Sequence, residues 1–315
     1  MANLLVTGGL GFIGSEFVRQ ESERGKFQNI YVLDSHTYAA NIDSLESISK
    51  NLNVEIIRGD INEVQIVDEL VNKVDYIVNF AAESHVDNSI IEIKPFLSAN
   101  ILGVANLLQA AKKHNIQRFV QISTDEVYGS INSGSFVETD RLNPRNPYSA
   151  SKASAEFLCN SFQNTYGLDV VITRTCNNYG PYQQFEKFIP TALKALIEGR
   201  KIPVYGDGSQ VREWIHVSDN CRAITKVLEE GQSGSIYNIG TSRHIKNLDL
   251  AKLLIMELGL NENSLEFVPD RPGHDQRYSI SSAKIMGELN WSPQIEFEDG
   301  LRETIKWFQG RLRGI

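Results

Sequence analysis

Short apolar runs alternate with amphipathic stretches along the first half of the chain. The apolar runs cover residues 4–6, 30–33, 54–57, 76–78, 119–122 and 170–172. Helical patterns lie between most of them, at 64–73, 99–114 and 148–166. Near-continuous apolar strands that alternate with helices are typical of a parallel sheet covered on both faces. The pattern therefore predicts an α/β fold built on a doubly wound parallel sheet.

The alternation loosens after Cys176. Segments rich in glycine, proline and asparagine occur at 177–184, 206–210 and 270–275, with shorter helical patterns between them. We predict a Rossmann-type cofactor domain over 1–176 and a smaller C-terminal domain over 177–315 that mainly carries substrate loops. The run 235–239 again has the pattern of a buried strand, so segments near 211–240 are expected to return to the first domain.

Composition excludes several classes of protein. The 315 residues can form a large α/β core or two coupled domains, and a net charge of −8 excludes a broadly basic nucleic-acid-binding surface. No apolar run approaches the roughly 20 residues that span a bilayer, and glycines interrupt the N-terminus too early for a signal peptide. Cys159, Cys176 and Cys221 form neither a disulfide framework nor a zinc pattern. We expect a cytoplasmic protein with no nucleic-acid or membrane partner.

Three glycines, Gly8, Gly11 and Gly14, follow the first predicted strand and begin a predicted helix. This arrangement allows a tight turn, close approach of the backbone to a pyrophosphate, and phosphate binding at the helix N-terminus. Asp34 ends the second predicted strand, where a carboxylate accepts ribose hydroxyls and repels a ribose phosphate. The sequence therefore predicts NAD rather than NADP, although Asp34 could also simply cap a turn.

Candidate catalytic groups occur at two places. Tyr148 and Lys152 lie one helical turn apart on one face, and a nearby ammonium together with a positive nicotinamide would favour the phenolate. Thr124, Asp125 and Glu126 end a predicted strand at the sheet edge where open α/β proteins bind ligands. Two adjacent carboxylates suit an elimination, in which one group removes a proton and the other protonates the leaving hydroxyl. Considered alone, each set could equally be ordinary surface residues.

The glycine spacing resembles that of the extended short-chain dehydrogenase/reductase superfamily. Further marks follow in order: Gly59-Asp60-Ile61, then Ala81-Ala82-Glu83-Ser84-His85, then Asn100. The motif Ser-Thr-Asp-Glu-Val-Tyr-Gly at 123–129, with Tyr38, Asn41 and the segments 82–87, 177–181 and 271–275, resembles the dTDP-glucose 4,6-dehydratases. The resemblance extends over residues 3–291, nearly the whole chain.

This resemblance implies an NAD-dependent dehydration of dTDP-glucose to a 4-keto-6-deoxy sugar nucleotide. Tyr148, with Lys152 and Thr124, would take the proton from the carbon-4 hydroxyl while hydride passes to NAD. Glu126 would remove the carbon-5 proton and Asp125 would protonate the carbon-6 hydroxyl as water leaves. Hydride would then return to carbon 6. The family also forms dimers through the helices expected at 99–114 and 148–166, which implies a homodimer.

The resemblance also implies binding residues. For NAD these are Gly8, Gly11, Phe12, Ile13, Gly14, Asp34, Ser35, His36, Thr37, Asp60, Ile61, Ala81, Ala82, Ser84, Ala99, Asn100, Tyr148, Lys152 and Asn178. For the substrate they are Ser84, His85, Thr124, Asn177, Lys187, Phe188, Pro203, Tyr205, Arg212, Asn247, Arg271, His274 and Arg277. Planar guanidinium groups suit diphosphate oxygens, which independently favours Arg212 and Arg277.

Two segments depart from the family pattern. Residues 34–41 lack the usual Lys-Leu and a glycine, and Glu213 and His216 stand where Asp and Tyr are more usual. A UDP-sugar dehydratase, a 4-epimerase, a decarboxylase and a non-enzymatic NAD sensor are the alternatives. The epimerase and decarboxylase lack the Asp-Glu pair, and a sensor would have lost Tyr148 or Lys152. The deoxysugar pathway, rhamnose or another, stays open, and His85, His216 and His274 have no metal-ligand spacing.

Overall fold

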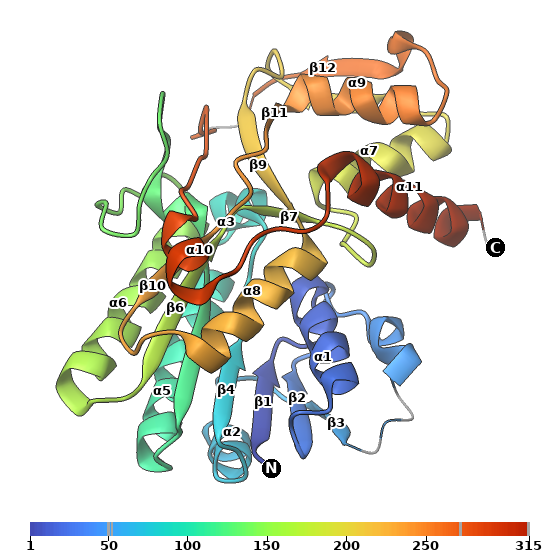
Figure 1. The fold of residues 1–315 in the computed structure, drawn as a ribbon. Helices are drawn as coiled ribbons and strands as arrows, with labels where there is room; N and C mark the ends of the chain where they lie inside the picture. Colours follow the sequence, from blue (N-terminus) through green and yellow to red (C-terminus); the bar gives the residue numbers. More distant parts are fainter. Residues whose placement is uncertain (49–50, 52, 271–272, 314–315) are drawn as a thin grey trace.

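The computed structural model describes residues 1–48, 51, 53–270 and 273–313. Its centre is a seven-stranded sheet in the order β10-β6-β5-β4-β1-β2-β3, with every neighbouring pair parallel (Figure 1). The strands are β1 (Asn3–Thr7), β2 (Asn29–Asp34), β3 (Val54–Arg58), β4 (Tyr76–Asn79), β5 (Arg118–Thr124), β6 (Val170–Thr175) and β10 (Ile236–Ile239). All the apolar runs predicted as strands form, and the predicted α/β fold is confirmed.

Both faces of this sheet are buried, because successive strand residues point to opposite sides. Leu4 and Val6 pack with α1 (Phe12–Arg24), α8 (Val217–Glu230) and α10 (Ala283–Leu289). Leu5, between them, packs on the other face with α2 (Val64–Val71), α5 (Val104–Lys113) and α6 (Pro147–Tyr166). A strand that contacts two cores needs apolar residues at consecutive positions, which explains the continuous runs in the sequence.

The helix expected at 99–114 is not uniform. It consists of α4 (Lys94–Leu97), a π-helical segment η2 (Ser98–Gly103) and α5. π-Helical turns are rare and frequently occur at functional sites. Here the segment packs closely against the loop after β3, since a Cβ on Gly103 would lie 2.4 Å from the Ile61 side chain.

A smaller lobe lies above the end of the sheet opposite the N-terminus (Figure 1). It contains a sheet of β7 (Asn177–Tyr179), β9 (Val211–His216) and β11 (His244–Lys246), and a pair formed by β8 (Ile202–Tyr205) and β12 (Leu265–Val268). Three helices, α7 (Phe188–Ile197), α9 (Asn247–Glu257) and α11 (Phe297–Arg313), surround its core. Short helical turns elsewhere are η1 (Ile42–Ile48), α3 (Val86–Ile91), η3 (Asp125–Tyr128) and η4 (Glu262–Ser264).

The chain passes repeatedly between the two parts. β9 belongs to the smaller lobe, while α8 and β10 return to the main sheet, where β10 pairs in parallel with β6. β1 lies between β2 and β4, so the strand order reverses there and the loops after β1 and β4 meet at the carboxyl edge. Ligands of open α/β sheets bind at such a reversal. Among the described residues, no helix is long and apolar enough to cross a membrane.

Candidate active site

A cavity of about 440 Å³ lies at the carboxyl edge of the sheet, between the sheet and the smaller lobe. The loops after β1 to β5 form one side, α6 contributes Tyr148 and Lys152, and the smaller lobe contributes Asn177, Lys187 and Trp214. The predicted site residues that line it are Gly8, Gly11, Phe12, Ile13, Gly14, Asp34, Ser35, Thr37, Asp60, Ile61, Ala81, Ala82, Ser84, Ala99, Thr124, Asp125, Glu126, Tyr148, Lys152, Asn177, Asn178, Lys187 and Phe188.

The glycine turn is too tightly packed for larger residues. Gly8 has φ +67°, and a Cβ there would lie 2.6 Å from the backbone nitrogen of Ala81. A Cβ on Gly14 would lie 2.3 Å from the carbonyl oxygen of Gly8. Gly11 is the N-cap of α1 and offers no side chain to bind the first amides of the helix. The turn therefore presents unprotected N–H groups at a close-packed helix N-terminus, which fits a dinucleotide pyrophosphate.

Asp34 both caps a turn and faces the cavity. Its carboxylate accepts hydrogen bonds from the backbone N–H groups of Leu10 at 3.0 Å and His36 at 2.9 Å. Each carboxylate oxygen has two lone pairs, so these bonds leave capacity for ribose hydroxyls. Asp34 can therefore cap the turn and also bind ribose hydroxyls, and its negative charge fits NAD rather than NADP.

Two residues predicted to contact NAD occupy other places. His36 and Asn100 are not among the residues that line the cavity. His36 lies in the turn that Asp34 caps, with φ +56°. Asn100 is buried, binds both backbone polar groups of Glu83, and donates a further hydrogen bond to Ser151. Asn100 thus holds the loop after β4 against α6, a structural contact that sequence spacing could not reveal.

The side chains around Tyr148 do not by themselves favour its phenolate form, and the effect expected from Lys152 together with a bound nicotinamide stays a prediction. The Lys152 ammonium donates a hydrogen bond to the carbonyl oxygen of Ile122 at 2.6 Å. Burial lowers the pKa of Lys152 to about 8. Burial, and then the Glu126 carboxylate, raise the pKa of Tyr148 far above its usual value, while the Thr124 side chain opposes this shift. The phenol is therefore protonated at neutral pH unless a further positive charge lies beside it.

The adjacent carboxyl groups of η3 have different surroundings. Asp125 is buried; its Oδ1 accepts a hydrogen bond from the Thr124 hydroxyl at 3.3 Å, and its Oδ2 has no hydrogen-bond partner among the described residues. Burial, and then Glu126, raise the pKa of Asp125 well above its usual value. Glu126 is half-buried, and its Oε2 accepts a hydrogen bond from the Asn146 amide at 3.1 Å. A buried acid with a raised pKa thus lies beside a carboxyl group that accepts a hydrogen bond from an amide.

Part of the predicted substrate set does not reach the cavity. Lys187 lines it and donates a hydrogen bond to the Ser84 carbonyl at 3.0 Å, and Asn177 and Phe188 also line it. The predicted residues that do not line it are His85, Pro203, Tyr205, Arg212, Asn247, His274 and Arg277. Arg271 lies outside the described residues.

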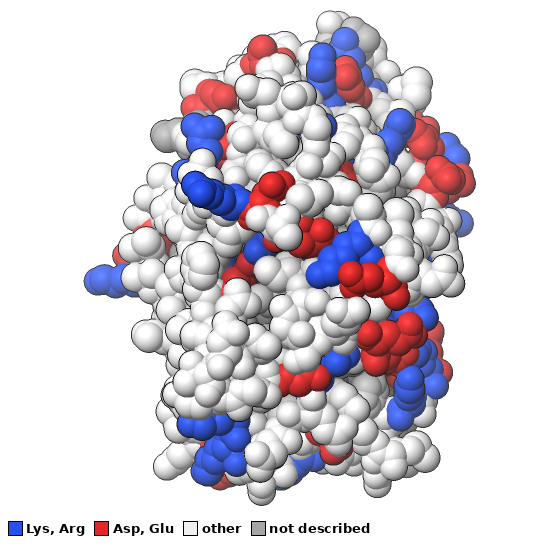
Figure 2. Space-filling view, turned by 60° about the vertical axis from the view of Figure 1, so that its left-hand side comes forward, with Lys and Arg blue, Asp and Glu red and all other residues white. Residues whose placement is uncertain are grey.

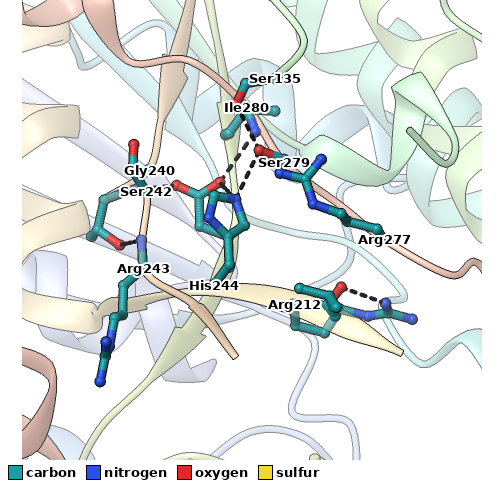
Figure 3. Close-up of polar contacts among 12 residues, drawn as sticks. Ser135, Arg212, Gly240, Ser242, Arg243, His244, Arg277, Ser279 and Ile280 are labelled. Atoms are coloured by element: carbon teal, nitrogen blue, oxygen red, sulfur yellow. Dashed lines mark hydrogen bonds and ion pairs between the residues drawn. The ribbon is translucent and has the colours of Figure 1, made fainter. Parts of the chain in front are cut away.

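Most of those residues gather beside the cavity, around β8 and β9. Arg212, beside Arg277 in Figure 3, is buried and donates hydrogen bonds to the carbonyls of Val211 and Asp275. Its guanidinium lies 4.2 Å from the Tyr278 ring centroid. Arg277 donates a hydrogen bond to the Gly134 carbonyl at 2.7 Å. β9 continues from Arg212 to the cavity-lining Trp214, so this group borders the site.

The unusual Glu213 has a structural role in this arrangement. It is fully buried and lies 3.5 Å from the His244 ring nitrogen, which in turn contacts the Ser279 hydroxyl (Figure 3). Its carboxylate accepts backbone hydrogen bonds from Thr241, Ser242 and Ile280. Glu213 therefore ties β9 to two other segments, and it does not line the cavity.

Sequence reasoning missed two residues at the site. Trp214 of β9 is one of them, since it lines the cavity although no motif marks it. Asn146 is the other, and it has a local signal, because an asparagine directly before a proline at the start of a helix predicts an N-cap. That signal places Asn146 two residues from Tyr148, but the contact with Glu126 depends on the tertiary fold. Among the residues the structure describes, no group of three or more His, Cys, Asp or Glu could hold a metal.

Comparison with known proteins identifies the family of the chain. The sequence model of the GDP-mannose 4,6 dehydratase family matches residues 5–304. The chain is 49% identical to the low-salt glycan biosynthesis protein Agl12 of Haloferax volcanii, over 98% of this chain and 99% of that protein. It is 47% identical to a dTDP-glucose 4,6-dehydratase of Streptomyces niveus, over 97% of this chain and 92% of the relative.

A solved structure is similarly close. The dTDP-glucose 4,6-dehydratase DesIV of Streptomyces venezuelae, crystallised with NAD bound, superimposes with a TM-score of 0.97 at 46% identity. The match covers 99% of this chain and 98% of DesIV. The chain therefore belongs to the GDP-mannose 4,6 dehydratase family, among the dTDP-glucose 4,6-dehydratases of the extended short-chain dehydrogenase/reductase superfamily.

Proposed function

We propose that this protein is an NAD-dependent hydro-lyase that converts dTDP-glucose to dTDP-4-keto-6-deoxyglucose. One observation carries the proposal: Asp125, whose pKa burial raises, and the hydrogen-bonded Glu126 line the same cavity as Tyr148 and Lys152. An oxidation alone needs only the last two residues. An elimination also needs an acid and a base, and the cavity supplies both.

The cavity fits bound NAD at the glycine turn and at Asp34. NAD would supply a reversible hydride acceptor at its nicotinamide. The residues that would hold it are those of the predicted set that line the cavity, from Gly8 to Asn178. His36 and Asn100 would act through the loops that they hold in place.

Different residues of the chain carry out the individual proton transfers. Tyr148 takes the proton of the carbon-4 hydroxyl, which the Thr124 hydroxyl also contacts, and the Lys152 ammonium stabilises the phenolate. Oxidation at carbon 4 acidifies the carbon-5 proton, and Glu126 removes it. Asp125 donates its proton to the carbon-6 hydroxyl, and water departs. Glu126 then returns a proton to carbon 5 as carbon 6 is reduced.

The two parts of the chain would bind different ligands. Residues 1–176, with the segments that return to the main sheet, would bind NAD, and 177–315 would mainly bind the sugar nucleotide. Asn177 and Lys187 line the cavity, where they would contact the sugar nucleotide. Arg212, Arg277 and the neighbouring predicted residues border it, where a nucleotide longer than the sugar would extend.

A homodimer is the assembly that we propose. Large apolar side chains are exposed on the elements from α3 to α6, among them Ile91 at 84%, Leu102 at 62% and Phe157 at 62%. Figure 2 shows a broad area with few charged side chains on the side of the molecule that carries α6. Exposed apolar patches of this kind mark protein interfaces. We also place the enzyme in the cytoplasm, because its three cysteines are buried and free.

Incubation with dTDP-glucose and, separately, with UDP-glucose tests the proposed function. Mass analysis should show loss of one water from dTDP-glucose without added cofactor. Water loss from UDP-glucose alone would assign the alternative UDP-sugar dehydratase. An isomer of unchanged mass would instead identify a 4-epimerase, and no conversion of either sugar would overturn the proposal.

Variants of the two carboxyl residues test their roles. Glu126→Gln should permit oxidation at carbon 4 but stall before elimination, so reduced-nicotinamide absorbance should accumulate in stopped flow. Asp125→Asn should retain exchange of the carbon-5 proton with heavy water while losing water slowly, because an amide is a poor acid. Rapid carbon-5 exchange in Glu126→Gln would show that another residue is the base.

A further inference from the structure

Asn146 contacts both the start of α6 and the carboxylate of Glu126. It is 8% exposed and is the N-cap residue of α6. Its Oδ1 accepts a hydrogen bond from the Ser149 backbone N–H at 2.8 Å, and its Nδ2 donates one to Glu126 Oε2 at 3.1 Å. The cap determines which way the amide points, because only the oxygen can accept from Ser149. The NH₂ group is therefore directed at Glu126.

The backbone around Asn146 holds the side chain in this place. Asn146 has φ −137° and ψ 162°, the extended conformation that a following proline favours. The Ser149 hydroxyl accepts a hydrogen bond from the Asn146 N–H, which completes a capping box. An amide donor held in this way orients one carboxylate oxygen and favours the ionised form without neutralising it.

Asp125 lacks an equivalent contact. It receives only the Thr124 hydroxyl at 3.3 Å, and its buried Oδ2 has no hydrogen-bond partner among the described residues. The two adjacent acids therefore differ in two ways: Asp125 is the more deeply buried, and only Glu126 receives the Asn146 amide. We propose that Asn146 is a positioning residue that orients the Glu126 carboxyl group, and that this contact makes Glu126 rather than Asp125 the base. The inference rests on the proposed dehydratase function.

Two substitutions separate this role from helix capping. Asn146→Asp keeps a good N-cap acceptor but replaces the donor with a second carboxylate beside Glu126, and Asn146→Gly removes the donor at a position where glycine is tolerated. The groups that face Glu126 are Asp125 from its own turn, Tyr148 from α6 and Tyr278 from the segment after His274. Neither substitution changes these groups, so a shift in the pH profile reports the lost donor.

The measurement is the pH dependence of kcat and KM with dTDP-glucose for the wild type and both variants. In Asn146→Gly we expect the acid limb of kcat to move up by about one pH unit, so that kcat falls about tenfold at pH values below the limb, with little change in KM. Asn146→Asp should move the acid limb further, because like charges resist ionisation together. Activity of both variants should recover at alkaline pH, which a structural defect would not do.

Ser149→Ala is the matched control, since it breaks the capping box but leaves the amide of Asn146 facing Glu126. It should lower Tm without moving the acid limb. If the wild type dehydrates dTDP-glucose and both Asn146 variants keep the wild-type acid limb, the role of Asn146 is refuted and the proposed function stands. If the wild type does not dehydrate this substrate, the proposed function has failed first.

Discussion

The buried carboxyl group of Asp125 lies beside a second acidic side chain, that of Glu126. Burial, Glu126 and Glu213 all raise its pKa, while Arg212 and Thr124 only partly oppose them. Because the folded pKa lies above the unfolded value near 4, the native protein retains a proton that the unfolded chain releases as pH rises. The stability contribution of this group is therefore full below about pH 4 and is lost as pH rises toward the folded pKa.

Asp125→Asn should remove this loss of stability with rising pH, since an amide is neutral at every pH. The variant should be more stable than the wild type at neutral pH, with a difference that grows by up to about 1.4 kcal/mol per pH unit above pH 4. Thermal unfolding of both proteins between pH 4 and 8 measures it. Glu23→Gln, a change at an exposed carboxylate, serves as the control. A difference that is constant with pH would contradict the raised pKa of Asp125.

Tyr148 is the other residue whose chemistry depends on its surroundings. Tyr148→Phe removes the phenol oxygen and keeps the ring that packs edge-on against Phe96. We expect kcat to fall by about 10²–10⁴ with a small change in Tm, because the lost group acts in proton transfer rather than packing. Steady-state rates with dTDP-glucose measure this. Tyr166→Phe, at a half-exposed tyrosine of the same helix, should leave the rate unchanged.

At the scale of elements, the loop between β1 and α1 depends on close backbone contact. A Cβ at Gly14 would lie 2.3 Å from the carbonyl oxygen of Gly8. With any larger residue at this position, the helix and the turn therefore cannot both keep their positions. Gly287, in α10, has no atom within 4 Å of its would-be Cβ. The two glycines therefore differ in packing and not in helical location.

Gly14→Ala should destabilise the protein by about 1–3 kcal/mol and release NAD, because overpacking displaces the turn. Gly287→Ala should instead be neutral or stabilise the protein by about 0.4–1 kcal/mol, since alanine restricts the unfolded chain. Denaturant unfolding and the nicotinamide content of the purified proteins measure both effects. Full retention of NAD by Gly14→Ala would place the pyrophosphate elsewhere.

At the scale of the whole molecule, apolar side chains remain exposed at two distant places. Phe157 on α6 is 62% exposed and lies with Ile91 and Leu102 on the elements proposed for the dimer. Phe267 on β12, in the smaller lobe, is 58% exposed. Similar exposure makes these two residues a matched pair for testing which surface is an interface.

Phe157→Glu should convert a dimer to a monomer, because a charge at an apolar interface loses its hydration without gaining a partner. Phe267→Glu should leave the mass unchanged. Sedimentation velocity of the two variants and the wild type measures the difference. A wild-type monomer, or equal dissociation by both variants, would rule out the proposed face.

The sequence by itself was sufficient to predict the sheet, the glycine turn and the position of Asp34. Each depends on a local pattern: apolar runs form strands buried on both faces, and glycines mark a turn where no Cβ fits. The same holds for Tyr148 and Lys152, whose spacing places them on one helical face, and for Thr124 to Glu126 at a strand end. Their catalytic roles remain predictions, whereas the fold class is confirmed.

Only the tertiary structure decided how these groups differ from one another. The pKa shift of Asp125 arises from burial and from charges on two different elements, the turn after β5 and the strand β9. Asn100 contacts Glu83, and Arg212 contacts Asp275, across long stretches of chain. The amide of Asn146 meets Glu126 only because α6 begins beside the end of β5. Contacts between segments distant in sequence depend on packing, so hydrophobic periodicity does not predict them.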